Sequence, residues 1–182
     1  MILLAKNLDI RKEAEKFLDL ENGLDDIDMA ISGAKDILAE VMSDDAEMRK
    51  YIRSQALKRG QVQSKAKSEE DSVYGIYYDF TERVVDILPH RTLAINRGEK
   101  EGFLSVKVLV DDQQMIDKIV DSYRSPQNMG NEGILEEVAQ DAYKRLIFPA
   151  IEREVRNHLT DLAQERAIKA VSYTHLRAHE TD

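Results

Sequence analysis

Apolar residues recur every three to four positions along much of this chain, and this period constrains the fold more than any other feature. Between Leu24 and Met42 the apolar positions are Ile27, Ala30, Ile31, Ala34, Ile37, Leu38, Val41 and Met42. This is the period of an amphipathic helix with one buried face. Similar stripes run over residues 112–124, 134–146 and 149–162. The chain is therefore expected to be mainly α, with several helices packed through their apolar faces.

The composition agrees with a charge-rich helical protein of one sizeable domain or two small ones. The 182 residues are 42% hydrophobic and 34% charged, and they include only 8 glycines and 3 prolines. There is no cysteine, which excludes disulfides, thiolate metal sites and cysteine nucleophiles. No apolar run reaches the length of a membrane span, and the opening apolar residues are too few for a signal-peptide core. These features indicate a cytoplasmic protein with no membrane contact.

One segment has the alternation of a strand. In "FLSVKVLVD" the residues Leu104, Val106, Val108 and Val110 fall on one face, which predicts one short β element around residues 103–110. Within the chain its best partner is "QVQSKAK", from Gln61 to Lys67. A helix is expected directly before "QVQSKAK". It starts at "SDDAE", where Asp44 and Glu47 have capping-box spacing, and it stops at Gly60.

The middle of the chain has two ambiguous stretches. In "YGIYYDF" the tyrosines could form core with polar handles or could stack on bases, and the core interpretation is favoured. The segment "TERVVDI" can form a short helix that Pro89 ends, and "HRTLAIN" predicts a further helical segment closed at Gly98.

Charge is unevenly distributed along the sequence. The net charge of −9 argues against a globally basic nucleic-acid binder. The segment "RKYIRSQALKRGQVQSKAK", however, contains no acidic residue, and its cations are Arg49, Lys50, Arg53, Lys58, Arg59, Lys65 and Lys67. Such a basic segment can contact phosphate groups, or it can be a solvated helix face followed by a charged loop.

Catalytic signatures are absent from the sequence. There is no glycine-rich phosphate loop, no HExxH and no GxSxG. Glu154 and His158 have the spacing of two metal ligands on one helix face, but a third ligand is missing. We therefore expect no catalytic residues, no metal site and no cofactor.

Three segments carry a family resemblance: "YYDFTERVVDILP", "HRTLAINRGEKEG" and "VAQDAYKRLIFPAIEREVR". Together they resemble the Tex family, bacterial transcription accessory proteins that bind nucleic acid. The second segment matches the family pattern at His90, Arg91, Leu93, Ala94, Arg97, Gly98, Glu99, Lys100, Glu101 and Gly102. The third matches at residues 141–146 and at Pro149, Glu152, Arg153, Glu154 and Arg156.

The resemblance implies a part of a longer protein. Residues 1–170 are similar to the N-terminal helical region of the family, whereas "VSYTHLRAHETD", residues 171–182, resembles a non-native tail. The family's ribonuclease-H-like domain, helix-hairpin-helix elements and OB-fold RNA-binding domain have no counterpart in this sequence. The implied function is that of a non-enzymatic fragment of a transcription accessory protein that contacts RNA or DNA. A helical scaffold that meets transcription or translation machinery is the alternative.

The segment "HRTLAINRGEKEG" is interpreted first as an architectural corner between helix and strand, with phosphate contact as the alternative. Gly98 and Gly102 can supply positive φ at two turns around the charged "EKE". At least one of Arg91 and Arg97 is expected to pair with a nearby acid, Glu99 or Glu101.

Overall fold

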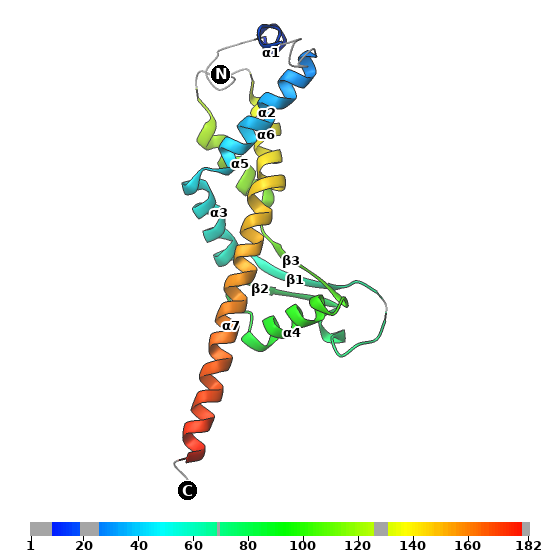
Figure 1. The fold of residues 1–182 in the computed structure, drawn as a ribbon, viewed down its shortest axis with the longest axis vertical. Coiled ribbons are helices and arrows are strands. Elements are labelled where there is room, and N and C mark those ends of the chain that lie inside the picture. Colours follow the sequence, from blue (N-terminus) through cyan, green and yellow to red (C-terminus); the bar gives the residue numbers. More distant parts are fainter. Residues whose placement is uncertain (1–8, 19–25, 69, 126–130, 180–182) are drawn as a thin grey trace. The chain divides into compact units, whose positions relative to one another are not determined.

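The computed structural model describes residues 9–18, 26–68, 70–125 and 131–179, with the backbone alone for residues 170–179 (Figure 1). The chain divides into two compact units. The first unit comprises Met1–Lys50 and Asp111–Pro149, and the second comprises Tyr51–Val110 and Ala150–Asp182. Most described residues are helical, so the expected mainly α fold is confirmed.

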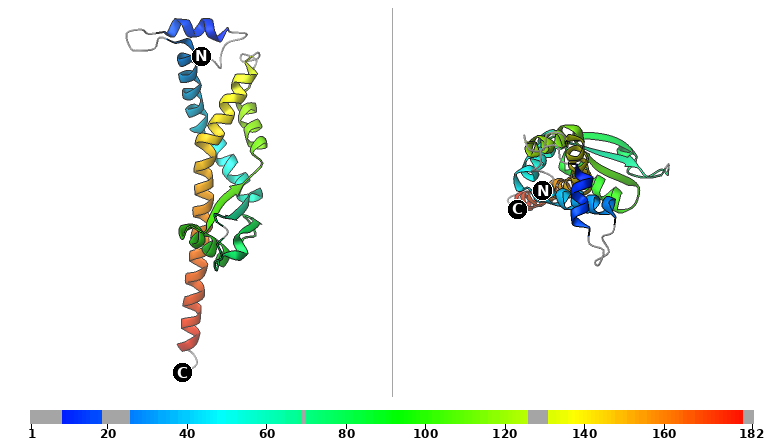
Figure 2. Two further views of the ribbon diagram at one scale, coloured as in Figure 1. Left: turned by 90° about the vertical axis from the view of Figure 1, so that its right-hand side faces the viewer. Right: turned by 90° about the horizontal axis from the view of Figure 1, so that it is seen from above.

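The first unit is built from helices. They are α1 (Ile10–Ala14), η2 (Glu15–Phe17), α2 (Ile27–Ser43), the first residues of α3 (Ala46–Arg59), α5 (Asp112–Tyr123), α6 (Glu132–Asp141) and the π-helical turn η5 (Ala142–Ile147). Helix α6 packs beside α5, and α2 packs against α6 and η5 (Figure 2). The buried side chains include Leu38, Met42, Met115, Ile119, Val138, Tyr143 and Ile147.

Helix α2 buries only part of its apolar stripe. Leu38, Ala39 and Met42 are buried, whereas Ile37 is 64% exposed and Val41 is 52% exposed. The sequence predicted a single buried face that included both of these residues. The apolar arc is wider than the face that α6 and η5 cover, so one edge of it stays in contact with solvent.

The second unit contains a three-stranded antiparallel sheet of order β2-β1-β3. Its elements are the remainder of α3, β1 (Gln61–Ala66), η4 (Gly75–Tyr77), β2 (Asp79–Arg83), α4 (Pro89–Lys100), β3 (Leu104–Leu109) and most of α7 (Phe148–His179). The buried face of the sheet carries Val62, Leu104, Val106 and Val108, and α4 packs against β3. The core of this unit therefore lies on one face of the sheet.

The predicted strand and its partner are confirmed, because β3 pairs along its whole length with β1. The helix predicted for "TERVVDI" is wrong, since Asp79–Arg83 forms β2 and pairs with β1. Ladder hydrogen bonds to a distant strand override the local helical pattern here. Pro89 does not end a helix but occupies the first turn of α4, where a missing N–H costs nothing.

The structure also tests the predictions for the tyrosine cluster and for the two ends of α3. Tyr74 and Tyr77 are 6% and 7% exposed, so the core interpretation of the tyrosine cluster is confirmed. Helix α3 ends at Arg59, directly before Gly60, as expected. Its first turn is capped by Asp45, whose side chain accepts from the backbone N–H of Met48 at 3.0 Å, and not by Asp44. The predicted helix start at Leu24 lies outside the described residues.

The backbone of α7 remains helical to His179, past the position where the amphipathic pattern stops. The non-native origin of residues 171–182 stays a prediction. Among the described residues, no helix combines the length and apolar character that crossing a membrane requires.

Candidate nucleic-acid interface

The seven cations of the basic segment lie on three consecutive parts of the chain. Five are on α3, Lys65 is on β1, and Lys67 follows that strand. Arg49 and Lys50 belong to the first unit, whereas the other five belong to the second. The seven cations predicted as one nucleic-acid contact are therefore divided between the two units.

Two of the seven cations make polar contacts within their own unit. Arg53 lies 3.4 Å from the carboxylate of Glu154, and Arg49 donates to the carbonyl oxygen of Ser43 at 3.4 Å. Within the part of the chain that the structure describes, the remaining cations are exposed and have no ion-pair partner: Lys50, Lys58, Arg59, Lys65 and Lys67. These five keep their ammonium or guanidinium groups available for an anionic ligand.

Strand pairing brings two further cations near Lys65. Lys107 on β3 is opposite Gln63, and Arg83 on β2 is opposite Gln61. Both side chains are exposed on the same face of the sheet as Lys65. Arg83 and Lys107 were not predicted from the sequence, because each lies among residues of mixed charge. The alternation of "SVKVL" was the available signal, since it places Lys107 on the face opposite the buried valines.

The segment "HRTLAINRGEKEG" forms α4 and the turn into β3. Gly102 has a φ of 89°, which confirms one of the two predicted glycine turns. The prediction for Gly98 is wrong, because Gly98 is helical and buried inside α4. A Cβ at Gly98 would lie 2.6 Å from Cδ1 of Leu104 and 3.0 Å from Cδ1 of Tyr74. Glycine is required there by close packing, and Glu99 and Lys100 are helical instead of forming a charged corner.

The arginines of this segment are bound by acids. Arg97 donates to Glu101 at 2.8 Å, as expected, and the hydroxyl of Tyr74 donates to the same carboxylate at 2.7 Å. Hydrogen bonds from Arg97 and then from Tyr74 hold the pKa of Glu101 below its usual value, and the bond to Glu101 raises the pKa of the Tyr74 phenol. This arrangement favours the architectural interpretation of the segment.

Arg91 is also engaged at the start of α4. It donates to Glu82 of β2 at 2.5 Å, and its guanidinium lies 5.9 Å from the centroid of the Phe80 ring. His90 is exposed, and Lys100 is exposed with no ion-pair partner in the described part of the chain. Of the segment's cations, Lys100 is therefore the one that remains available to a ligand.

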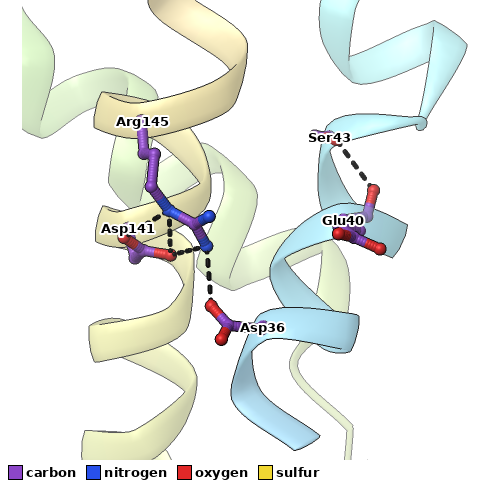
Figure 3. A network of polar contacts seen from close by, with 5 residues as sticks. All are labelled: Asp36, Glu40, Ser43, Asp141 and Arg145. Carbon is purple, nitrogen blue, oxygen red and sulfur yellow. Dashed lines mark hydrogen bonds and ion pairs between the residues drawn. The ribbon is translucent and has the colours of Figure 1, made fainter. Parts of the chain in front are cut away.

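The third family segment contributes to both units. In the first unit, Tyr143 of η5 donates to Asp112 at 2.7 Å. Arg145 reaches Asp141 at 2.7 Å and Asp36 of α2 at 2.9 Å, so one guanidinium links α2 to the helix that carries it (Figure 3). The hydrogen bond with Asp141 raises the pKa of Arg145.

In the second unit, the third segment supports the sheet and α4. The backbone N–H of Val108 donates to Glu152 of α7 at 2.6 Å, and Arg156 of α7 forms a two-pronged ion pair with Glu99 of α4. Both contacts join parts of the chain that are more than forty residues apart. The role of this segment that the geometry supports is structural.

Glu154 and His158, which have the spacing of two metal ligands, are not part of a larger ligand cluster in the described ranges. Glu154 faces Arg53, and His158 is partly exposed on the same helix. In the described ranges, no group of three or more His, Cys, Asp or Glu side chains is arranged to hold a metal ion.

Comparison with known proteins gives the family of the chain. A family model described as Tex central region-like matches residues 5–171. The chain belongs to the Tex family. Its membership agrees with the three segments that pointed to Tex and with the contacts those segments make in the fold.

Relatives of this Tex-family chain come from bacteria and animals. The uncharacterized protein YdcI of Bacillus subtilis is 40% identical over 168 residues, which cover 87% of this chain and 23% of YdcI. The transcriptional accessory protein Tex of Neisseria gonorrhoeae is 29% identical over 177 residues, which cover 92% of this chain and 23% of that protein. A human protein named S1 RNA-binding domain-containing protein 1 is 30% identical over 151 residues, 75% of this chain and 15% of its own length.

The chain thus spans about a quarter or less of these relatives. Their names describe a transcriptional accessory protein, an S1 RNA-binding domain and an uncharacterized protein, and none of the three names an enzyme. The family is therefore one with nucleic-acid-related members.

Proposed function

We propose that this chain is a fragment of a nucleic-acid-binding transcription accessory protein. We propose further that the fragment is non-enzymatic and that it contacts RNA or DNA itself. The observation that carries the proposal is a set of exposed cations in the second unit, Lys58, Arg59, Lys65 and Lys67, which have no ion-pair partner among the residues that the structure describes. They lie in a chain with a net charge of −9. Cations that are not neutralised by the protein can neutralise phosphates and release counterions. The names of the Tex and S1 relatives support the same assignment.

The charge of each unit supports placing the contacts on the second unit. The second unit has 15 Lys and Arg against 14 Asp and Glu, a net charge of +1. The first unit has 11 against 21, a net charge of −10. The acidic character of the whole chain therefore comes from the first unit, and the second does not repel a polyanion.

The contacts would be independent of sequence. Lysine and arginine side chains on an exposed surface meet phosphates and sugars, which position a nucleic acid without reading its bases. The chain would thus assist or position nucleic acid for the rest of a longer protein, and a cytoplasmic location is part of this proposal.

Charge reversal tests the proposal directly. Lys58→Glu combined with Arg59→Glu should weaken binding of the chain to a labelled RNA at least tenfold in fluorescence anisotropy at low salt. Lys144→Glu, an exposed cation of the first unit, is the control and should leave binding within about twofold. Equal binding by wild type and the double variant would reject the basic segment as the contact.

A second candidate function is that of a protein-interaction module. The exposed Ile37 and Val41 on α2 lie in a unit with a net charge of −10, which favours a partner segment that is apolar with basic flanks. Ile37→Glu should then release a protein partner that is retained after nuclease treatment, and raised salt should weaken its retention. Retention that depends on intact nucleic acid would reject this candidate.

A further inference from the structure

The sheet of the second unit has one face without an apolar layer on it. Strand residues alternate between faces, so each residue beside a buried one belongs to the opposite side. This second side, here called the open face, carries Gln61, Gln63 and Lys65 of β1, Asp79, Thr81 and Arg83 of β2, and Ser105, Lys107 and Leu109 of β3. All nine residues are exposed or partly exposed.

The open face is basic. It holds three cations, Lys65, Arg83 and Lys107, and one acid, Asp79. Arg83 lies 3.6 Å from Asp86 in an exposed pair, and exposed pairs of this kind contribute little. In the described part of the chain, Lys65 and Lys107 have no ion-pair partner, although Asp79 is opposite Lys65.

The register places the cations close together. Lys65 and Lys107 are diagonal neighbours on adjacent strands, a relation that separates Cβ atoms by roughly 7–8 Å. Arg83 is opposite Gln61, four residues along β1 from Lys65, which is roughly 13 Å along the strand direction at about 3.3 Å per residue. The three cations therefore form a row across one face of the sheet, long enough to contact successive phosphates of one nucleic-acid strand.

Apart from Leu109, the uncharged residues of the open face carry hydrogen-bonding groups. Gln61, Gln63, Thr81 and Ser105 offer amides and hydroxyls on the open face, and the face has no aromatic side chain, because Phe80 points to the other side. A single strand can bring sugars and unpaired base edges to such groups, whereas paired bases are held away from a flat surface. Without aromatic rings, base stacking would not contribute.

We propose that the open face of the β2-β1-β3 sheet binds the phosphate backbone of single-stranded nucleic acid through Lys65, Lys107 and Arg83. This inference rests on the proposed function and deepens it, since it names a surface and a nucleic-acid form. The solvent-facing side of an antiparallel sheet is usually polar, but this does not explain an excess of positive charge. The open face has an excess of cations, although the net charge of the chain is −9.

Binding should be weak and sensitive to salt. Each phosphate contact with a single strand contributes about 0.7 to the slope of log affinity against log salt, so three contacts contribute about 2. Replacement of Arg83 and Lys107 should remove about 1.4 of this slope.

The experiment compares three double variants of the whole chain with wild type, by anisotropy of a labelled 12-nucleotide oligo-uridine at several salt concentrations. Arg83→Glu with Lys107→Glu changes the open face and leaves the basic segment intact. Arg166→Glu with Lys169→Glu is the matched control, since these exposed cations of α7 have the same types and the same change in charge. Lys58→Glu with Arg59→Glu tests the basic segment. Circular dichroism checks the fold, and Arg83→Gln with Lys107→Gln replaces the first variant if that variant unfolds.

The expected result is at least tenfold weaker binding and a smaller salt slope for the open-face variant, with binding within about twofold of wild type for the α7 control. Equal binding by these two variants, with loss in the Lys58 and Arg59 variant, overturns the open face and leaves the proposed function in place. Absence of binding by folded wild type overturns both. Tighter binding to a duplex of the same length overturns the assignment to single strands.

Discussion

A methyl group at Gly98 would have no room inside the second unit. The Cβ of alanine would lie 2.6 Å from Cδ1 and 3.0 Å from Cγ of Leu104, which is fully buried. Gly33 on α2 is helical too, but nothing lies within 4 Å of its Cβ position. Replacement by alanine raises helix propensity equally at Gly98 and Gly33. The difference in unfolding free energy between the two variants therefore measures the cost of the extra methyl group beside Leu104.

We expect Gly98→Ala to be less stable than Gly33→Ala by roughly 1–3 kcal/mol, the usual cost of an added methyl group in a packed core. Urea unfolding measures both variants, and Gly33→Ala should itself be about 0.5–1 kcal/mol more stable than wild type. Equal unfolding free energies for the two variants would show that Leu104 and Tyr74 can move aside.

The carboxylate of Glu101 gives a prediction for acid stability. Its pKa lies below the usual value of 4.5 in the folded chain, because Arg97 and Tyr74 donate to it. The unfolded state therefore binds the proton more tightly, and the stabilisation is complete above about pH 4.5 and is lost as the pH falls through the lower folded-state pKa.

Unfolding free energies measured against pH should thus differ between wild type and Glu101→Gln at neutral pH, and the difference should shrink below about pH 4.5. A difference that stays constant to the lowest pH at which the protein is folded would mean that Glu101 acts through packing alone.

Among the helices and strands, α7 supplies a hydrogen-bond acceptor to the edge strand of the sheet. Strand β3 is an edge strand, and the N–H of Val108 would be unpaired without the carboxylate of Glu152 at 2.6 Å. We expect Glu152→Ala to lower the unfolding free energy by about 1–3 kcal/mol, since a partly buried donor loses its partner.

Glu152→Gln keeps an acceptor and should recover part of that loss. Hydrogen exchange of the Val108 amide provides the second measurement, with faster exchange expected in Glu152→Ala. Unchanged exchange in that variant would show that Glu152 does not protect the edge.

The same elements show what a sequence can and cannot predict. The alternation around Val106 identified β3, and the 3.6-residue stripes identified the helices, because both periods are local. Strand β2 was missed because its residues have no strand period of their own, and they become a strand by pairing with β1. The position of Gly98 beside Leu104 was missed for a related reason, since it depends on how α4 packs against β3.

The candidate site was predicted in part for the same physical reason. Lys65 belongs to a run of cations that is visible in the sequence, whereas Arg83 and Lys107 lie 18 and 42 positions after Lys65, outside that run. Strand register alone brings these three residues to one face. Conversely, Arg53 was predicted as a contact, and only the structure shows its pairing with Glu154.

At the scale of the whole molecule, the uneven charge links the fold to the proposed function. The first unit has a net charge of −10 and the second a net charge of +1, although the sequence interleaves them along the chain. A chain with net charge −9 can therefore bind a polyanion, provided that the contacts are confined to the second unit. We expect binding to be electrostatic and insensitive to base sequence.

The salt dependence of RNA binding by the 182-residue chain distinguishes electrostatic binding from its absence. Anisotropy of a short labelled RNA should give an affinity that falls linearly with salt on logarithmic axes, with a slope of magnitude about 2 or more. Similar affinities for oligonucleotides of unrelated sequence should accompany it. If the folded chain does not bind at the lowest salt, or if its binding is unchanged by salt, electrostatic binding of nucleic acid by the second unit is contradicted.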